Sequence, residues 1–146
     1  MINIADIQQL NELSGSSIVT RYLVEITQPM LVDFLTLSGD KNTLHQSDAV
    51  SKPVVPGNML LCLLPRILQA NIQLPTQYQL YTVGYERVRF RSNVHIGDKL
   101  SASIEILSTR VQKNGIYLTY QFSFFTGESV RSSVEGKFSD YYVKQI

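Results

Sequence analysis

The sequence has little of the chemistry that covalent cross-links or metal centres need. Of its 146 residues one is Cys, two are His and none is Trp. The single thiol, Cys62, excludes an internal disulfide and any zinc site that requires two thiolates. Because His45 and His95 are the only histidines, a His-rich metal centre is also excluded. We therefore expect neither a metal nor another cofactor.

Excess charge and long apolar runs are also missing. Thirteen Lys and Arg residues against twelve Asp and Glu residues leave a net charge of +1, which argues against nucleic acid or an anionic membrane surface as a partner. The longest apolar run, Met59–Leu64, is too short to span a bilayer. The first ten residues lack the basic start and apolar stretch of a signal peptide. We expect a cytoplasmic protein that does not enter a membrane.

What the chain does have is an ordinary globular composition, with 44% hydrophobic and 17% charged residues. Its length suits one domain with one core, and no repeat, linker or low-complexity tract divides it. Residues 1–146 are therefore interpreted as a single domain that binds or transforms a small molecule.

The first half of the chain predicts one strand and two helices. Residues 16–27 are β-branched and aromatic with period-two alternation, which is typical of a strand. Thr27 and Gly39 then bracket an amphipathic helix as its N-cap and its left-handed C-cap. Residues 40–56 predict an ordered loop. Residues 58–70 are apolar nearly all round, which predicts one long buried helix, bent at Pro65.

The second half predicts four strands because the apolar period changes to two after Leu80. Asn114-Gly115 predicts a two-residue hairpin with a type I′ turn, and Gly97 and Gly127 predict two further turns. The four strands span residues 80–90, 99–112, 116–126 and 130–142. Together with the first strand they predict an α+β fold, in which a curved five-stranded antiparallel sheet wraps a long central helix. We expect Cys62 to be a small buried hydrophobe of that helix.

The loop between the two helices carries the chemically active side chains. Asp40, Asn42 and His45 lie within six residues, and the loop runs on to Gly57 at the start of the second helix. One interpretation is structural, because Asp and Asn in loops readily bond their own backbone. The other is catalytic, because an acid/base pair beside the free N–H groups of a helix start can handle a proton and a developing oxyanion.

Three segments resemble a known family. Residues 34–45, FLTLSGDKNTLH, resemble the signature of MaoC-like, (R)-specific enoyl-CoA hydratases, which runs Ser/Thr-Gly-Asp-x-Asn-Pro-aliphatic-His. Residues 55–61 resemble the start of that family's central helix, and residues 89–100 resemble its strand end with a Gly-Asp turn. The resemblance extends in order over residues 16–143 and implies the hot-dog fold.

The departures from the family pattern bear on the reaction. Thr43 replaces the signature proline, and Pro56 replaces a histidine often found before the helix glycine. Pro-Gly at this point resembles β-hydroxyacyl-ACP dehydratases, which pair a histidine with an acidic residue of the central helix. Here the equivalent position is Cys62, and no carboxylate lies between Asn58 and Ala70. The dehydratase-type pair therefore cannot form, whereas the hydratase-type pair can.

The resemblance implies reversible hydration of a trans-2-enoyl thioester, carried by coenzyme A or an acyl carrier protein, to the (3R)-hydroxyacyl thioester. Asp40 and His45 would be the catalytic residues, the Gly57 N–H would bind the thioester oxygen, and Asn42 would support the loop. It also implies a homodimer joined edge to edge. Two alternatives remain, namely an acyl-thioester hydrolase of the same fold and a non-catalytic acyl-binding or heterodimer subunit.

Two other groups of residues are assigned with less specificity. Arg87, Arg89 and Arg91 alternate and are expected to share one face of a strand, either in solvent or against the phosphates of a coenzyme A or carrier arm. His95 is expected to be a surface residue at a strand end without a catalytic role.

Overall fold

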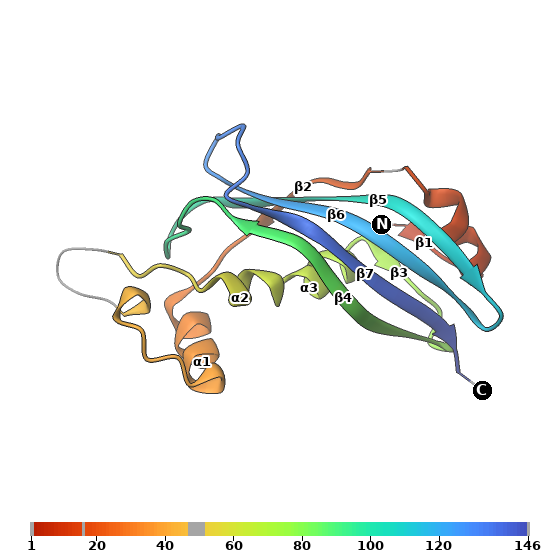
Figure 1. Cartoon of the computed structure of the whole chain (residues 1–146), viewed down its shortest axis with the longest axis horizontal. Helices are drawn as coiled ribbons and strands as arrows, with labels where there is room; N and C mark the ends of the chain where they lie inside the picture. The colour runs from red at the N-terminus through yellow and green to blue at the C-terminus, as the bar shows by residue number, and fades with distance from the viewer. Residues whose placement is uncertain (1, 16, 47–51, 146) are drawn as a thin grey trace.

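A curved antiparallel sheet forms one layer of the molecule, and short helices lie against its concave face (Figure 1). The computed structural model describes residues 2–15, 17–46 and 52–145. The sheet has five strands in the order β2-β5-β6-β7-β4, every neighbouring pair antiparallel. Their bounds are β2 (Ser17–Val24), β4 (Tyr78–Phe90), β5 (Leu100–Gln112), β6 (Gly115–Thr126) and β7 (Val134–Lys144). The predicted α+β architecture with a five-stranded sheet is confirmed.

Helices α2 and α3 lie beneath the sheet, α1 and the turn η2 lie at one end of the molecule, and η1 lies at the other end (Figure 1). Helix α1 (Gln28–Ser38) begins after Thr27, whose hydroxyl accepts from the Met30 N–H, and ends at Gly39 in the left-handed conformation, as predicted. A 3₁₀ turn, η2 (Thr43–His45), interrupts the segment predicted as a loop, of which residues 47–51 lie outside the described residues. Three elements have no counterpart in the prediction: the 3₁₀ helix η1 (Ile7–Leu13) and the paired short strands β1 (Ile2–Asn3) and β3 (Ile72–Gln73).

The predicted long central helix is wrong in its length. It consists of two short helices, α2 (Gly57–Leu61) and α3 (Leu64–Gln69), separated at Cys62 and Leu63. The reason is Pro65, which has no N–H to donate to Leu61 and so ends the bonding pattern of α2. Pro65 instead lies in the first turn of α3, where a missing N–H is tolerated.

The surroundings of Cys62 also differ from the prediction. Its side chain is exposed, not buried. The two short helices bury only one side against the sheet, and their other side faces away. That exposed side comprises Asn58, Cys62, Pro65, Arg66 and Gln69.

The hairpin between β5 and β6 is confirmed, but the predicted type I′ turn is not. Gln112 pairs with Gly115, so the two-residue loop is Lys113-Asn114, and neither Asn114 nor Gly115 has a positive φ. Gly115 is required for another reason. A Cβ there would overlap the backbone carbonyl oxygen of Tyr142 on the neighbouring strand. The turns predicted at Gly97 and Gly127 are present, and both glycines have a positive φ.

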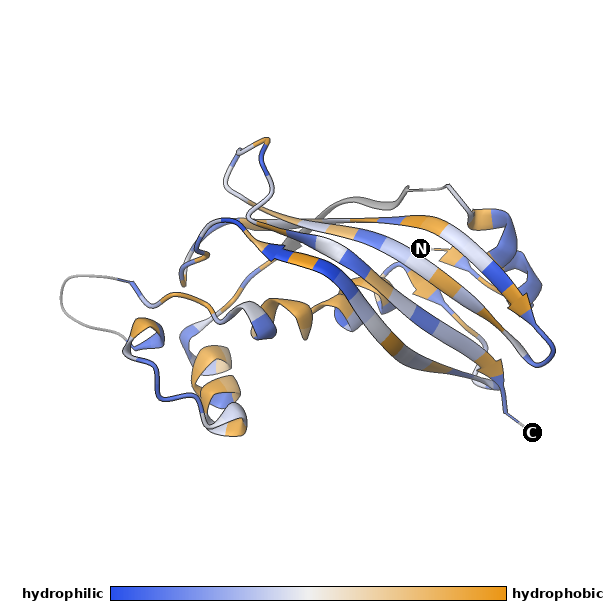
Figure 2. Cartoon of the chain, viewed as in Figure 1, coloured by the Kyte–Doolittle hydropathy of each residue, from blue (hydrophilic) through white to orange (hydrophobic). Residues whose placement is uncertain are grey.

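Alternating burial along β5, β6 and β7 builds the core between the sheet and the helices, and Figure 2 shows the matching alternation of apolar and polar residues. The largest fully buried side chains include Tyr120, Phe122 and Phe124 of β6, with Leu60, Leu64 and Ile67 of the helices facing them. This apolar layer fixes where the start of α2 lies relative to the sheet.

One acidic side chain of the inner layer is buried. Asp140 on β7 is 1% exposed, and its Oδ1 has no hydrogen-bond partner among the described residues. Burial raises the pKa of this carboxyl to about 6, and a hydrogen bond from the Thr82 side chain offsets only part of the rise. Ionised Asp140 is therefore a destabilising group.

We expect Asp140→Asn to stabilise the protein above neutral pH. A folded-state pKa above the unfolded value means that the wild type is most stable when Asp140 is protonated, and that this stability is lost as pH rises through about 6. The advantage of the variant should grow by roughly 2 to 3 kcal/mol between about pH 4 and pH 8. Urea unfolding at both pH values measures it, with exposed Asp33→Asn as the control. An equal advantage at both pH values would contradict the assignment.

Candidate active site

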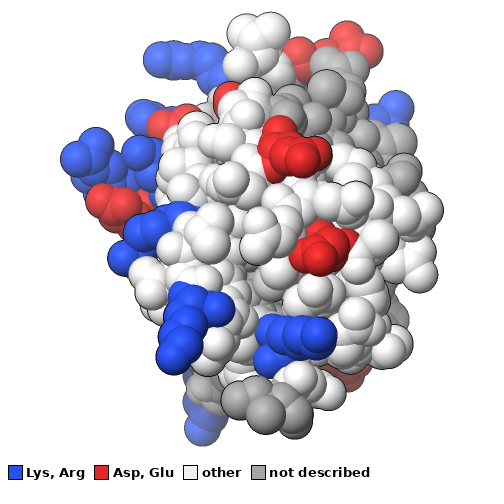
Figure 3. All heavy atoms as spheres, turned by 90° about the vertical axis from the view of Figure 1, so that its right-hand side faces the viewer, with Lys and Arg blue, Asp and Glu red and all other residues white. Residues whose placement is uncertain are grey.

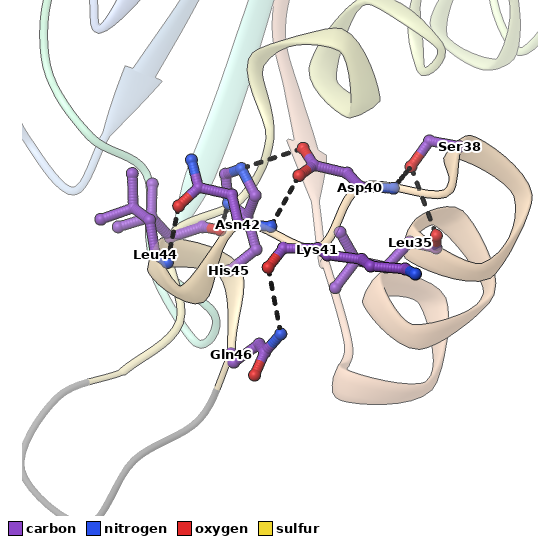
Figure 4. Close-up of polar contacts among 9 residues, drawn as sticks. Leu35, Ser38, Asp40, Lys41, Asn42, Leu44, His45 and Gln46 are labelled. Carbon is purple, nitrogen blue, oxygen red and sulfur yellow. Dashed lines mark hydrogen bonds and ion pairs between the residues drawn. The ribbon is translucent and has the colours of Figure 1, made fainter.

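The segment after α1 is ordered by its own side chains. The left-handed conformation of Gly39 reverses the chain at the end of the helix. The Asp40 N–H then donates to Ser38 Oγ at 3.3 Å, and Asp40 Oδ1 accepts from the Asn42 N–H at 2.9 Å. With one carboxylate oxygen engaged by the backbone, the other, Oδ2, is directed to the inside of the segment (Figure 4).

Asn42 begins the 3₁₀ turn that carries the histidine. Its Oδ1 accepts from the Leu44 N–H at 3.1 Å, and its carbonyl oxygen accepts from the His45 N–H at 3.1 Å. These are the bonds of a capped turn. Both bonds of Asn42 are made within the loop, and its side-chain oxygen is engaged by the Leu44 N–H.

The imidazole of His45 is oriented by a hydrogen bond to a backbone carbonyl group. The residue is 9% exposed, and Nδ1 lies 2.7 Å from the Val54 carbonyl oxygen. Since a carbonyl can only accept, Nδ1 carries a proton and donates it. In the neutral imidazole Nε2 therefore holds the free lone pair. The Val54 N–H in turn donates to the Leu44 carbonyl at 3.0 Å, which ties the two segments together.

Asp40 and His45 face each other. Asp40 Oδ2 lies 3.5 Å from His45 Nε2, and the two side chains point toward one another in Figure 4. At this separation the carboxylate and imidazole share one small space, without a short direct hydrogen bond. The Asp40 side chain is 37% exposed, so solvent reaches the pair from the carboxylate side. Two groups that can each accept a proton thus face the same point.

Both side chains line a cavity of about 360 Å³ at the start of α2. Gly57, the first residue of α2, lines the same cavity. Its N–H points out of the helix start, where no preceding turn supplies an acceptor. The rest of the wall is mixed. Phe34, Leu60, Val94 and Val134 contribute apolar side chains, and Ser38, Asn58, Ser92 and Asn93 contribute polar ones. An acid/base pair, a backbone donor and a partly apolar wall therefore meet in one space.

Phe90, at the end of β4, is a site residue that sequence reasoning missed. A Cβ on Gly57 would come within 2.7 Å of Phe90 Cδ1 and 2.8 Å of Cζ, so the ring packs against the glycine backbone. The ring is 52% exposed and lines the cavity. Glycine is thus required here by the aromatic ring itself. The Val54 carbonyl was also missed, and a backbone acceptor leaves no signal in a sequence.

The other candidates lie outside this cavity or are otherwise engaged. His95 lies near Asp98, with 3.8 Å between Nδ1 and Oδ2, and does not line the cavity. The expected alternation of Arg87, Arg89 and Arg91 is wrong, because a bulge lies between Glu86 and Arg89 and Arg87 has a φ of 52°.

Arg91 forms an ion pair with Glu135. Hydrogen bonds from the Ser132 hydroxyl and from Arg91 lower the pKa of the Glu135 carboxyl. Arg91 is therefore occupied within the chain, which leaves Arg87 and Arg89 without an ion-pair partner among the described residues.

The described residues contain no group of three or more His, Cys, Asp or Glu side chains placed to hold a metal ion. None of the helices in this part of the chain has the length and apolar character needed to cross a membrane.

Comparison with solved structures identifies the fold. The chain is similar to a monoamine oxidase regulatory protein from Archaeoglobus fulgidus, with a TM-score of 0.75 and 18% identity over 100% of this chain and 99% of the other. It is similar to an (R)-hydratase from A. caviae involved in PHA biosynthesis (TM-score 0.63, 21% identity, 91% and 96% covered). It is also similar to a hot-dog-like protein from Thermanaerovibrio acidaminovorans (TM-score 0.59, 16% identity, 92% and 87% covered).

The chain has the hot-dog fold, as the sequence resemblance implied. No protein-family model matches the sequence, and no curated protein matches it either. At these identities the comparisons identify the architecture, and the chemistry is argued from the site.

The contact between Gly57 and Phe90 yields a stability prediction. Gly57→Ala should destabilise the protein by about 1 to 3 kcal/mol, because the added methyl group overlaps the ring. The same change in a Phe90→Ala background should cost much less. Thermal or urea unfolding of the two single variants and the double variant measures this coupling. Strictly additive effects would show that the ring does not restrict residue 57.

Proposed function

We propose that the protein is a hydro-lyase that adds water reversibly to trans-2-enoyl thioesters and gives (3R)-hydroxyacyl thioesters. One observation carries the proposal: Asp40 Oδ2 and His45 Nε2 face each other at 3.5 Å inside a cavity that also contains the start of α2. The similarity to a protein described as an (R)-hydratase supports it. The substrate would be carried by coenzyme A or by an acyl carrier protein.

The histidine is oriented to act as the base. Its Nδ1–H is committed to the Val54 carbonyl, so the lone pair on Nε2 is the one available inside the cavity. A water molecule held between Nε2 and Asp40 Oδ2 would have one O–H directed to each group. As its oxygen bonds to C3 of the enoyl group, Nε2 takes one proton. The proton held by the pair then passes to C2, which restores both side chains.

Charge builds on the thioester oxygen while the enolate exists. We assign the Gly57 N–H as its donor, since the start of α2 leaves this group without an intrahelical partner. Loss of such a donor raises a barrier by about 3 kcal/mol in other enzymes. The Phe90 ring covers one side of the Gly57 backbone, so the thioester would approach the N–H from the side that faces Asp40 and His45.

We expect Asp40→Asn and His45→Ala each to lower the rate of hydration by roughly 10²-fold or more, because each removes a proton acceptor. Loss of the absorbance of the conjugated enoyl-CoA measures the reaction. Far-UV circular dichroism and unfolding curves check the fold. His95→Ala and Asp98→Asn are the matched controls, since they remove the chain's other His–Asp pair, which lies outside the cavity. Near-normal hydration by the Asp40 and His45 variants would reject the assignment.

Two further measurements separate the alternatives. Release of free thiol from acyl-CoA, without loss of the enoyl absorbance, would identify a thioesterase of this fold. Binding of acyl thioesters without any turnover would identify a non-catalytic or heterodimer subunit. The geometry of His45 favours the hydratase, because a subunit that only binds has no need for an oriented base.

We further propose that the functional unit is a homodimer joined through β4. This strand is an edge of the sheet, it is 13 residues long, and both of its faces are exposed from Tyr81 to Arg87. Tyr81, Val83 and Tyr85 are each about half exposed. An exposed edge with apolar side chains favours pairing with another strand, and two-fold symmetry lets one edge pair with its own copy.

Val83→Asp should therefore shift the protein from dimer to monomer. The change introduces a charge at the centre of the edge, which like charges from the symmetry copy would oppose. Analytical ultracentrifugation or light scattering with size exclusion measures the mass. Val130→Asp is the control, because Val130 is 93% exposed in the loop between β6 and β7. A monomeric wild type, or a dimeric Val83→Asp variant, would contradict the proposed edge.

A further inference from the structure

A second cavity lies at the opposite end of the sheet from Asp40 and His45. It measures about 380 Å³ and is formed where the β5–β6 turn, the end of β7 and η1 meet, at the right of Figure 1. Its floor is apolar, with Ile7, Val111 and Ile116, and its rim carries the side chains of Lys113 and Lys144. The mechanism proposed above makes no use of it within one chain.

The chemistry of this cavity suits an organic phosphate. None of the described residues that line it is acidic, and neither Lys113 nor Lys144 has a carboxylate within ion-pair distance among the described residues. Seen from this end, Lys and Arg side chains lie mainly at the left and in the lower part of the face, and Asp and Glu side chains lie in its middle and upper part (Figure 3). Two free ammonium groups bind phosphate well.

The remaining lining suits the rest of a nucleotide. Gln8, Gln112, Asn114 and Gln145 supply amides that can both donate and accept, which matches the edge of a base. The Tyr78 hydroxyl accepts from the Ile7 N–H at 3.3 Å, which leaves its own proton to donate. An apolar floor with amides and cations around it is compatible with a phosphorylated nucleoside.

The two cavities are tied to the two ends of a single strand. Tyr78, the first residue of β4, lines the second cavity, and Phe90, the last residue, lines the cavity of Asp40 and His45. At 3.3 Å per residue the 13-residue strand is about 43 Å long. The pantetheine arm of coenzyme A is much shorter, so one substrate cannot reach both cavities of the same chain.

If β4 pairs with β4 of a second copy, cavities of different chains come closer together than the two cavities of one chain. Two-fold symmetry makes the pairing antiparallel, so the Tyr78 end of one chain lies beside the Phe90 end of the other. Lys144 of β7 pairs with Tyr78 of β4, so Lys144 lies at the same end of the strand. In the proposed dimer, the cavity at Lys113 and Lys144 of one copy would therefore lie beside the Asp40–His45 cavity of the second copy.

We infer that the cavity at Lys113 and Lys144 binds the phosphorylated nucleotide end of a coenzyme A thioester whose acyl end is held by Asp40 and His45 of a second copy. This inference rests on the proposed function and names the residues that would hold the carrier end of its substrate. Coenzyme A carries a nucleotide, whereas the arm of an acyl carrier protein does not. The cavity at Lys113 and Lys144 would therefore contribute to binding only when coenzyme A is the carrier, and only in the dimer.

Kinetics with two substrates test the inference. For Lys113→Ala/Lys144→Ala, KM for a trans-2-enoyl-CoA should rise at least about tenfold with kcat unchanged, because only a binding contact is lost. KM for the matching enoyl-pantetheine, which lacks the nucleotide, should not change. Lys99→Ala, an exposed lysine outside both cavities, is the control. Unchanged KM for the coenzyme A substrate would overturn the inference while leaving the hydratase proposal intact.

Direct binding separates this result from the proposed function. Wild-type protein should bind 3′-phosphoadenosine 5′-diphosphate in calorimetry, and the double lysine variant should lose that binding, whether or not the protein hydrates any thioester. Absence of binding to the wild type would overturn the inference.

Co-expression tests the contribution of the second copy. In a mixed dimer of the Asp40→Asn chain and the double lysine chain, one catalytic pair and one lysine cavity from different chains form one intact site. At low substrate concentration the mixed dimer should exceed the summed rates of the two parent variants. A rate no higher than that sum would show that the cavity does not serve the other copy's site.

Discussion

The hydrogen bond from His45 Nδ1 to the Val54 carbonyl is the contact on which the candidate site depends. It joins the segment after α1 to the segment that leads into α2, and the Val54 N–H to Leu44 carbonyl bond closes the connection from the other side. It also decides which imidazole nitrogen faces the cavity. Without it, His45 would keep its place in the chain but not its chemistry, because Nε2 would no longer be directed to Asp40.

Asp40 is positioned by a different principle. Its Oδ1 binds the Asn42 N–H and its own N–H binds Ser38, so the carboxylate is held by residues two positions away. Short-range bonds of this type form wherever the local sequence allows them. The site therefore combines a locally determined carboxylate with an imidazole whose orientation requires tertiary contact.

That difference explains how much the sequence could predict. The helix from Thr27 to Gly39, the alternating strands and the segment with Asp40, Asn42 and His45 depend on neighbours in the chain, and each was found where expected. The sequence predicted one long helix bent at Pro65, whereas the structure has two short helices because Pro65 ends the hydrogen-bonding pattern of α2. The role of Gly57 against Phe90 depends on residues more than thirty positions apart, and periodicity carries no information about such pairs.

The edge strand β4 links the fold to assembly. Its register is interrupted at Val83 and again near Arg87, yet both ends border a cavity. Bulges of this kind twist an edge and limit which partners can pair with it. In the proposed homodimer, the partner of β4 would be a copy that carries the same irregularities.

The division of the central segment has a consequence for the order of folding. Helices of five and six residues fall far below the length that persists alone in water, so α2 and α3 exist only against a formed sheet. The sheet itself joins distant parts of the chain, as β2 pairs with β5 and β4 with β7, and such pairing is slow to form. Since Gly57 is the first residue of α2, the amide that faces the cavity becomes ordered late, after the scaffold above it is complete.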